Sequence, residues 1–267
     1  LAYLNDASGV TVLKEVADKE PAFRAYALAA LSTLTDGDAI IALRELMHHK
    51  EIEVRYGAFR ALSIASPNDA EVMTKKLEPG FTIHQINSTG EPAIHVSRRR
   101  NAEVVFFGAN QKFSAPLFLR AGHDVLVQCP ENGDKVKLLL IAPGQKPREL
   151  YSSMRVTDVI SAAAELGVEY PAIVEMLEQA QKQRNLDGML AFDQIPQGGR
   201  TFQRPETAEG PATEMVGSAG MLPNLFDFDP TGMEIETEPT PDPEKKPASA
   251  SEESEAEALG GVSFGVK

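Results

Sequence analysis

EPAFRAYALAALS at Glu20–Ser32 and EIEVRYGAFRALS at Glu51–Ser63 are near-duplicates, displaced by 31 residues. Six positions coincide, including Arg24 and Arg55. In each copy apolar residues fall at offsets of 0, 4, 7, 8 and 11, which define one face of an α-helix. A further amphipathic segment precedes each copy, so we expect each unit to be a pair of antiparallel helices.

Within each copy an apolar residue precedes arginine, and spaced alanines and a leucine follow, from Phe23 to Leu31 and from Val54 to Leu62. This pattern resembles HEAT repeats over Leu1–Leu77, although the repeat is shorter than the usual length of about 40 residues. The resemblance implies that the shared arginine bridges to acidic residues of neighbouring turns. Because LAYL at the start aligns with LSTL at Leu31–Leu34, we expect the chain to begin inside a longer array, with any targeting signal upstream.

After Pro79–Gly80 the apolar pattern changes from helical to alternating, in short runs rich in β-branched and aromatic residues. The spacing predicts an antiparallel sheet or small sandwich from Phe81 to Tyr151. Val104–Phe107 is apolar on both faces and is expected to lie centrally. Asn132–Gly133 predicts a type I′ hairpin turn.

Helical periodicity returns at Asp158–Leu166 and Ala172–Asn185, and we expect both helices to pack on the open face of the sheet. The predicted fold class is therefore α+β and multidomain. The expected parts are HEAT-like helical repeats at 1–78, an antiparallel β-rich domain at 79–153, a helical hairpin packed on it at 154–197, and a disordered acidic tail at 198–267.

The tail carries most of the charge. From Pro205 to Lys267 there are fourteen acidic residues and three lysines, a balance of −11 out of the net −13 of the chain. Its proline content and low aliphatic content predict disorder. The island Met221–Asp229 is interpreted as a linear binding motif or as a contact back onto its own domain, with four apolar anchors: Leu222, Leu225, Phe226 and Phe228.

Composition argues against several classes of partner. An acidic chain whose only dense basic run is Arg98–Arg100 is not expected to bind nucleic acid. Cys129 stands alone, which excludes an intrachain disulfide and a cysteine-based zinc site. Nor is there a run of 18 apolar residues that would span a bilayer.

Residues that carry chemistry are sparse. His84 and His95 are conceivable metal ligands on neighbouring strands, but without a nearby carboxylate we interpret them as structural. The sequence has no nucleophile elbow and no phosphate-binding loop. We therefore predict no enzyme activity, no metal and no cofactor, and expect other proteins rather than a small molecule as partners.

Tyr26, Phe59 and Arg60 fall off the apolar stripe of the repeats and are the predicted exposed partner-binding residues. The segments EPAFRAYALAALSTL, EVRYGAFRAL and HVSRRRNAEVVFFGANQKF are similar to the repeat-bearing extension of a bacterial flagellar P-ring protein, over Leu1 to Arg204. That resemblance implies a structural role in the periplasmic basal body at the cell envelope. The localisation is otherwise unknown, and without that resemblance we expect the cytoplasm.

Three functions remain open at this point. The first is a non-enzymatic scaffold for protein–protein interaction. The second is a β domain that binds a small ligand or acts as an enzyme, which a pocket with converging polar groups between the sheet and the helices would favour. The third is an intracellular regulatory adaptor that uses the motif at Leu222–Asp229.

Overall fold

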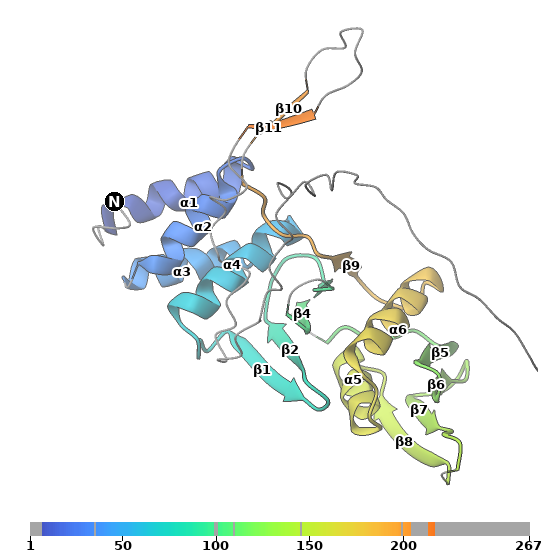
Figure 1. Cartoon of the computed structure of the whole chain (residues 1–267). Helices are drawn as coiled ribbons and strands as arrows, with labels where there is room; N and C mark the ends of the chain where they lie inside the picture. The colour runs from blue at the N-terminus through green and yellow to red at the C-terminus, as the bar shows by residue number, and fades with distance from the viewer. Residues whose placement is uncertain are drawn as a thin grey trace, which may run out of the picture. The chain divides into compact units, whose positions relative to one another are not determined.

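The computed structural model describes residues 7–34, 36–98, 101–108, 110–144, 146–198, 200–203 and 213–216. After a single 3-10 turn at Ala7–Gly9, four helices follow one another: α1 (Val10–Lys19), α2 (Arg24–Thr33), α3 (Gly37–Leu46) and α4 (Ile52–Ala65) (Figure 1). The Asp36 carboxylate caps α3 by accepting from the backbone N–H of Asp38 at 2.7 Å. The helices pack pairwise, α1 with α2 and α3 with α4, and α2 also contacts α4.

A five-stranded sheet follows, in the order β1-β2-β4-β3-β9. Its pairing is mixed, because β2 lies parallel to β4 and β3 parallel to β9, whereas the other neighbours are antiparallel. The strands are β1 (Val72–Leu77), β2 (Phe81–Ile86), β3 (Ala93–Val96), β4 (Glu103–Phe107) and β9 (Met189–Phe192).

Both faces of this sheet are covered. In β4, Val105 and Phe107 belong to the core formed with α1–α4, and the alternate residues Val104 and Phe106 belong to the core formed with later helices. This follows from the period of two in a strand, which places successive side chains on opposite faces. Every residue of β4 is buried, so the prediction that Val104–Phe107 lies centrally is confirmed.

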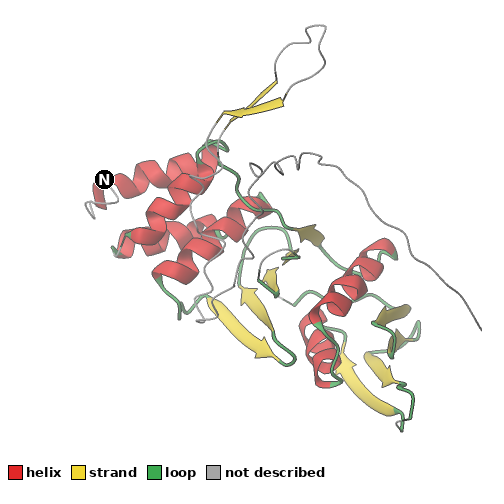
Figure 2. Cartoon of the chain, in the orientation of Figure 1, coloured by secondary structure: helices red, strands yellow, loops and turns green. Residues whose placement is uncertain are grey.

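A second sheet of four antiparallel strands follows in the chain, in sequence order. Its inward residues pack against two helices, α6 against β5 and α5 against β8 (Figure 2). The elements are β5 (Leu117–Ala121), β6 (Val125–Cys129), β7 (Lys135–Leu140), β8 (Arg148–Ser153), α5 (Val156–Glu165) and α6 (Tyr170–Lys182). A two-stranded ribbon, β10 (Arg200–Gln203) with β11 (Thr213–Val216), comes last.

The predicted HEAT-like array over Leu1–Leu77 is wrong. Beyond α4 the chain does not continue into another helix pair but turns into the edge strand β1, Val72–Leu77, inside the predicted array. The helix α4 packs against β3, so the place of a next repeat is taken by a sheet. The four helices are one face of a mixed α and β core rather than units of an array.

The two arginines that suggested the repeat have different roles. Arg24 pairs with Glu51 and Glu53, each at 3.1 Å, as the bridging interpretation requires. Arg55 pairs with no carboxylate of the described residues and donates to the backbone oxygens of Glu91 at 2.6 Å and Lys50 at 3.1 Å. For Arg55 the prediction is wrong, because the neighbouring layer is a sheet rather than a helix that carries acids.

The predicted fold class, helical repeats followed by one small antiparallel domain, is also wrong. Across residues 7–198, as far as the structure describes them, there are six short helices and nine strands. The strands form two sheets, and the first sheet contains parallel pairs. The hairpin at Asn132–Gly133 exists, but five residues join β6 to β7 and neither residue has a positive φ, so the turn is not type I′.

The predicted boundaries at residues 78, 153 and 197 stay predictions. Almost all of the predicted tail, and with it the motif at Leu222–Asp229, lies outside the described residues. Among the residues that are described, no helix is both long and apolar enough to cross a membrane.

Candidate functional site

Ionisable side chains gather between α4 and the first sheet. The carboxylate of Glu103 accepts a hydrogen bond from the Tyr56 hydroxyl at 2.6 Å and pairs with Arg60 at 3.3 Å. His84 from β2 approaches the same carboxylate at 3.5 Å, and the ring of His95 from β3 stacks on Tyr56 with centroids 3.7 Å apart. All five side chains are buried.

Burial sets the charge states of this cluster. It raises the pKa of Tyr56 well above its usual value, with the nearby Glu103 charge acting in the same direction. Burial also lowers the pKa of His95 to about 4, against the opposing charges of Glu103 and Asp193. For Glu103, burial alone would raise the pKa, but the hydrogen bond from His84 and the charge of Arg60 outweigh it, so the pKa is lowered.

This cluster joins the layers of the fold. Tyr170 from α6 donates to the backbone oxygens of Ser97 at 2.5 Å and Glu103 at 2.7 Å, so helices on both sides of the sheet meet at β4. Because the carboxylate, the guanidinium and the imidazoles are sealed from solvent, they contribute to the specificity of packing.

The solvent face of the second sheet is different in kind. In β5 and β6 the burial alternates, so that Leu117, Leu119, Val125 and Val127 point inward. Outward-facing positions of such sheets are normally polar. Here Phe118 is 58% exposed and Tyr151 is 65% exposed, and the half-buried Leu126 and Leu139 lie directly opposite each other on β6 and β7.

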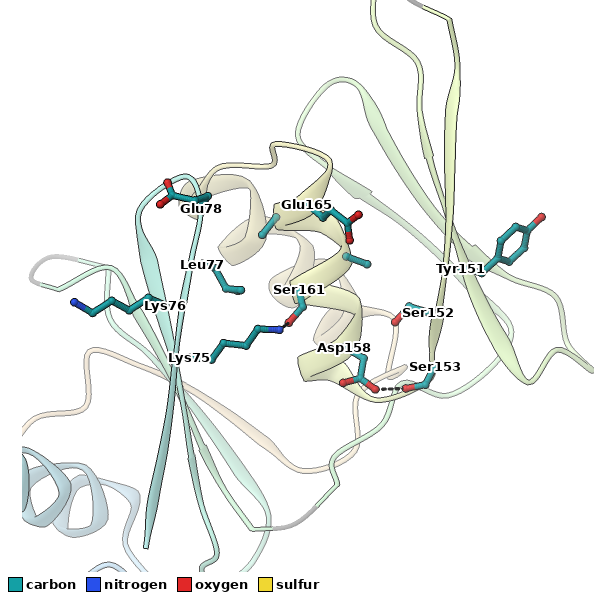
Figure 3. Close-up of a pocket in the computed structure, with 12 residues that line it drawn as sticks. Lys75, Lys76, Leu77, Glu78, Tyr151, Ser152, Ser153, Asp158, Ser161 and Glu165 are labelled. Atoms are coloured by element: carbon teal, nitrogen blue, oxygen red, sulfur yellow. Dashed lines mark hydrogen bonds between the residues drawn. The ribbon is translucent and has the colours of Figure 1, made fainter. Parts of the chain in front are cut away.

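The register aligns these residues into rows. Phe118 lies opposite Gln128, Gln128 opposite Lys137, and Lys137 opposite Tyr151, so one residue from each strand forms a straight row across the sheet. We call these four residues the aromatic row. All four line an open depression of about 680 Å³. Tyr151 projects from β8 away from α5, into solvent (Figure 3).

Next to this row, charges are partly compensated. Lys137 donates to Glu149 at 2.8 Å, which raises the pKa of Lys137 through that hydrogen bond. Lys135 at the start of β7 and Arg120 in β5 are exposed on the same face. Asp134 lines the same depression, so the face combines apolar anchors with charges of both signs.

A second, polar groove of about 650 Å³ lies between β1, β8 and α5 (Figure 3). Its side chains already bind one another across the groove. Ser153 donates to Asp158 at 2.6 Å, and Lys75 donates to Ser161 at 3.0 Å. We interpret this groove as a solvated junction because these two hydrogen bonds already cross it.

The sequence predicted three exposed partner-binding residues on the helices. Two of them are buried in the structure. Phe59 is fully buried and Arg60 is 2% exposed. Their expected exposure is wrong because α4 is covered on more than one side. Tyr26 is half-buried, and its role in binding stays a prediction. Leu222, Leu225, Phe226 and Phe228 lie outside the described residues.

The aromatic row was missed. The alternation in LFLRA, Leu117–Ala121, was readable, and the outward parity of Phe118 is the signal that would have drawn attention to it. His84 and His95, the conceivable metal ligands, do not lie on neighbouring strands. Both are opposite Val105, on either side of β4. Among the described residues no group of three His, Cys, Asp or Glu is arranged to hold a metal ion.

Comparison with known proteins gives no family. No protein-family model matches the chain, and we found no significant match among curated proteins or solved structures. With the helical array absent and no family match, the resemblances to HEAT repeats and to a flagellar P-ring extension are withdrawn. The fold defines the class of a mixed α and β protein, in which one sheet is covered on both faces and the other on one face only.

Proposed function

We propose that this protein is a non-enzymatic interaction module that binds another protein through the open face of its second sheet. The aromatic row carries the proposal, because two large aromatic side chains stand exposed at its ends. Support for a non-enzymatic role comes from the cluster around Glu103, whose ionisable groups are sealed from any substrate.

The row has the features of a binding hot spot. Aromatic residues dominate the energetics of protein interfaces, and they act best when a partner removes them from water. Burying one such side chain stabilises a complex by about 1.5–3 kcal/mol. Leu126 and Leu139 extend the apolar surface beside the row, and Arg120 and Lys135 provide polar contacts at the rim.

A protein partner fits the electrostatics better than a nucleic acid. Single-stranded nucleic acid needs aromatic platforms within a strongly positive groove. Here Glu149 neutralises Lys137, and the chain as a whole has a net charge of −13. Arg120 and Lys135 remain, and Asp134 lines the same depression, so the face suits a partner surface in which apolar side chains lie beside a few charged groups.

Site-specific photo-crosslinking tests the proposal. Benzoylphenylalanine would be introduced at position 118 or 151 in the full chain and irradiated in an extract of the producing organism. A matched control is Val12, which is 60% exposed on α1 and distant in sequence from the second sheet. We expect the same partner to be captured from positions 118 and 151 and not from 12.

A quantitative measurement follows with the purified partner. Phe118→Ala and Tyr151→Ala should each weaken the Kd by about tenfold, the equivalent of about 1.4 kcal/mol, while Val12→Ala leaves it unchanged. Equal capture at all three positions, or an unchanged Kd in both aromatic variants, overturns the proposal. Sedimentation of the protein alone identifies the case in which the captured partner is a second copy of this chain.

A further inference from the structure

A small cavity of about 290 Å³ lies where β2 and β4 end. These two strands are parallel, so their carboxyl ends meet at the same edge of the sheet. In open sheets with parallel strands, ligands bind at this edge, just beyond the strand ends. The cavity is lined by Met73, Gln85, Ile86, Asn87, Phe106, Gly108, Asn110, Gln111, Arg155 and Thr157.

Backbone and side-chain hydrogen bonds hold the walls in place. Gly108 donates its N–H to the Ile86 oxygen at 3.0 Å, which fixes the two strand ends to each other. The Gln111 side chain donates to the oxygens of Ala93 at 3.0 Å and Phe107 at 2.8 Å. The backbone carbonyl oxygen of Gln111 accepts from the N–H of Val156 at 3.0 Å, so the start of α5 is tied to the cavity wall.

The charge of the cavity is uncompensated. Arg155 is the one ionisable residue of its lining. Within the described part of the chain, no carboxylate pairs with the Arg155 guanidinium and no acceptor binds its buried Nε. The buried Oε1 of Gln111, whose residue is 6% exposed, likewise has no donor there. The unmet Arg155 donor indicates a site that is completed by an acceptor from outside these residues, whereas the Gln111 oxygen would need a donor.

We propose that this cavity binds a small organic carboxylate, with the anionic group at Arg155 and an apolar group against Met73 and Phe106. A guanidinium presents two parallel N–H groups that match a carboxylate, and no lining acid competes for it. The cavity volume lies just below the range typical of ligand sites, about 300–1,000 Å³, which limits the ligand to a compact molecule. This site departs from the sequence-based prediction that small molecules are not partners.

Benzoate is a suitable probe because it joins one carboxylate to one compact apolar ring, and benzamide is its neutral counterpart. Titration of the ¹⁵N-labelled full chain should give saturable shifts at the amides of Gly108, Asn110 and Gln111 with benzoate. Benzamide should give none at the same concentrations. Inorganic phosphate provides a third arm that separates carboxylate recognition from binding of any anion.

Two variants identify the charge responsible. Arg155→Gln removes the guanidinium in the cavity and should weaken benzoate binding by about tenfold or more. Lys112→Gln removes the charge of an exposed residue that forms an isolated β-bridge with Arg155 but does not line the cavity. This variant should leave benzoate binding unchanged.

Circular dichroism and thermal unfolding would verify that both variants are folded. If Arg155→Gln is not folded, it is replaced by Arg155→Lys, which keeps the charge but loses the paired N–H groups of the guanidinium. Three outcomes overturn the proposal: no saturable shift with benzoate, equal weakening by both variants, or binding of phosphate in place of benzoate.

Discussion

The two sheets of this protein differ in how many of their faces are covered. The five-stranded sheet has helices on one side and a second core on the other, and its central strand β4 is wholly buried. The four-stranded sheet is covered on one side only and exposes aromatic residues on the other. The first arrangement buries side chains on both faces, whereas the second leaves aromatic side chains exposed to solvent.

The largest expected contrast is between two phenylalanines. Phe107 in β4 is fully buried, and Phe118 in β5 is 58% exposed. Phe107→Ala should lower the free energy of unfolding by about 3–5 kcal/mol, because it removes buried contacts and leaves a cavity. Phe118→Ala should change it by less than about 0.5 kcal/mol. Urea unfolding measures both, and equal losses would show that the second face is also covered.

The buried carboxylate offers the next test. Glu103→Ala leaves Arg60 without its buried carboxylate partner and should destabilise the fold by about 3 kcal/mol. Glu103→Gln keeps the shape and the acceptor for Tyr56, so its loss should be smaller. If the alanine variant unfolds at the same urea concentration as the wild type, the cluster does not join the layers.

The pH dependence of stability should reflect His95. Its pKa is about 4 in the native state against 6.5 in a solvated chain, so the unfolded state holds more protons between these values. Stability therefore falls as the pH decreases from about 6.5 to about 4, by at most about 3 kcal/mol.

His95→Phe, which keeps an aromatic ring beside Tyr56, should remove this dependence when urea midpoints are measured across the same window. The lowered pKa of Glu103 acts at lower pH, because its contribution is present above the pKa of an unfolded carboxyl group and is lost as the pH falls through the native value. An unchanged pH profile in the histidine variant would assign the dependence to other groups.

A small effect is also expected for an ion pair on the open sheet. Lys137 and Glu149 form an ion pair at its surface. Glu149→Ala should cost no more than about 1 kcal/mol, and high salt should abolish the difference. A loss as large as that of Glu103→Ala, measured in the same urea series, would contradict the division between a covered and an open sheet.

Local periodicity predicted some parts of this molecule well. The offsets in EVRYGAFRALS identify the helix α4, Ile52–Ala65, and the doubly apolar VVFF identifies the central strand. Periodicity assumes, however, that a helix has one buried face. A sheet formed by residues farther along the chain covers the other side of α4, which the sequence does not reveal. The prediction that Phe59 and Arg60 are exposed was wrong for this reason.

Long-range pairing accounts for most of the remaining misses. Nothing in VMTKKL, Val72–Leu77, distinguishes an exposed edge strand from the end of a helix, because its position depends on β2. The cavity at Arg155 was also unpredictable, since it unites the ends of β2 and β4 with the start of α5. The aromatic row could have been found, because outward parity in a hairpin is local.

The parallel pairing of β3 with β9 determines when the first sheet can be finished during synthesis. Ala93–Val96 aligns with Met189–Phe192, and the whole second sheet with α5 and α6 lies between them in the chain. On the ribosome, the nascent chain therefore presents an incomplete sheet edge at β3 until residue 192 has emerged. A translational pause before that point would prolong the exposure of β3, the strand that carries His95.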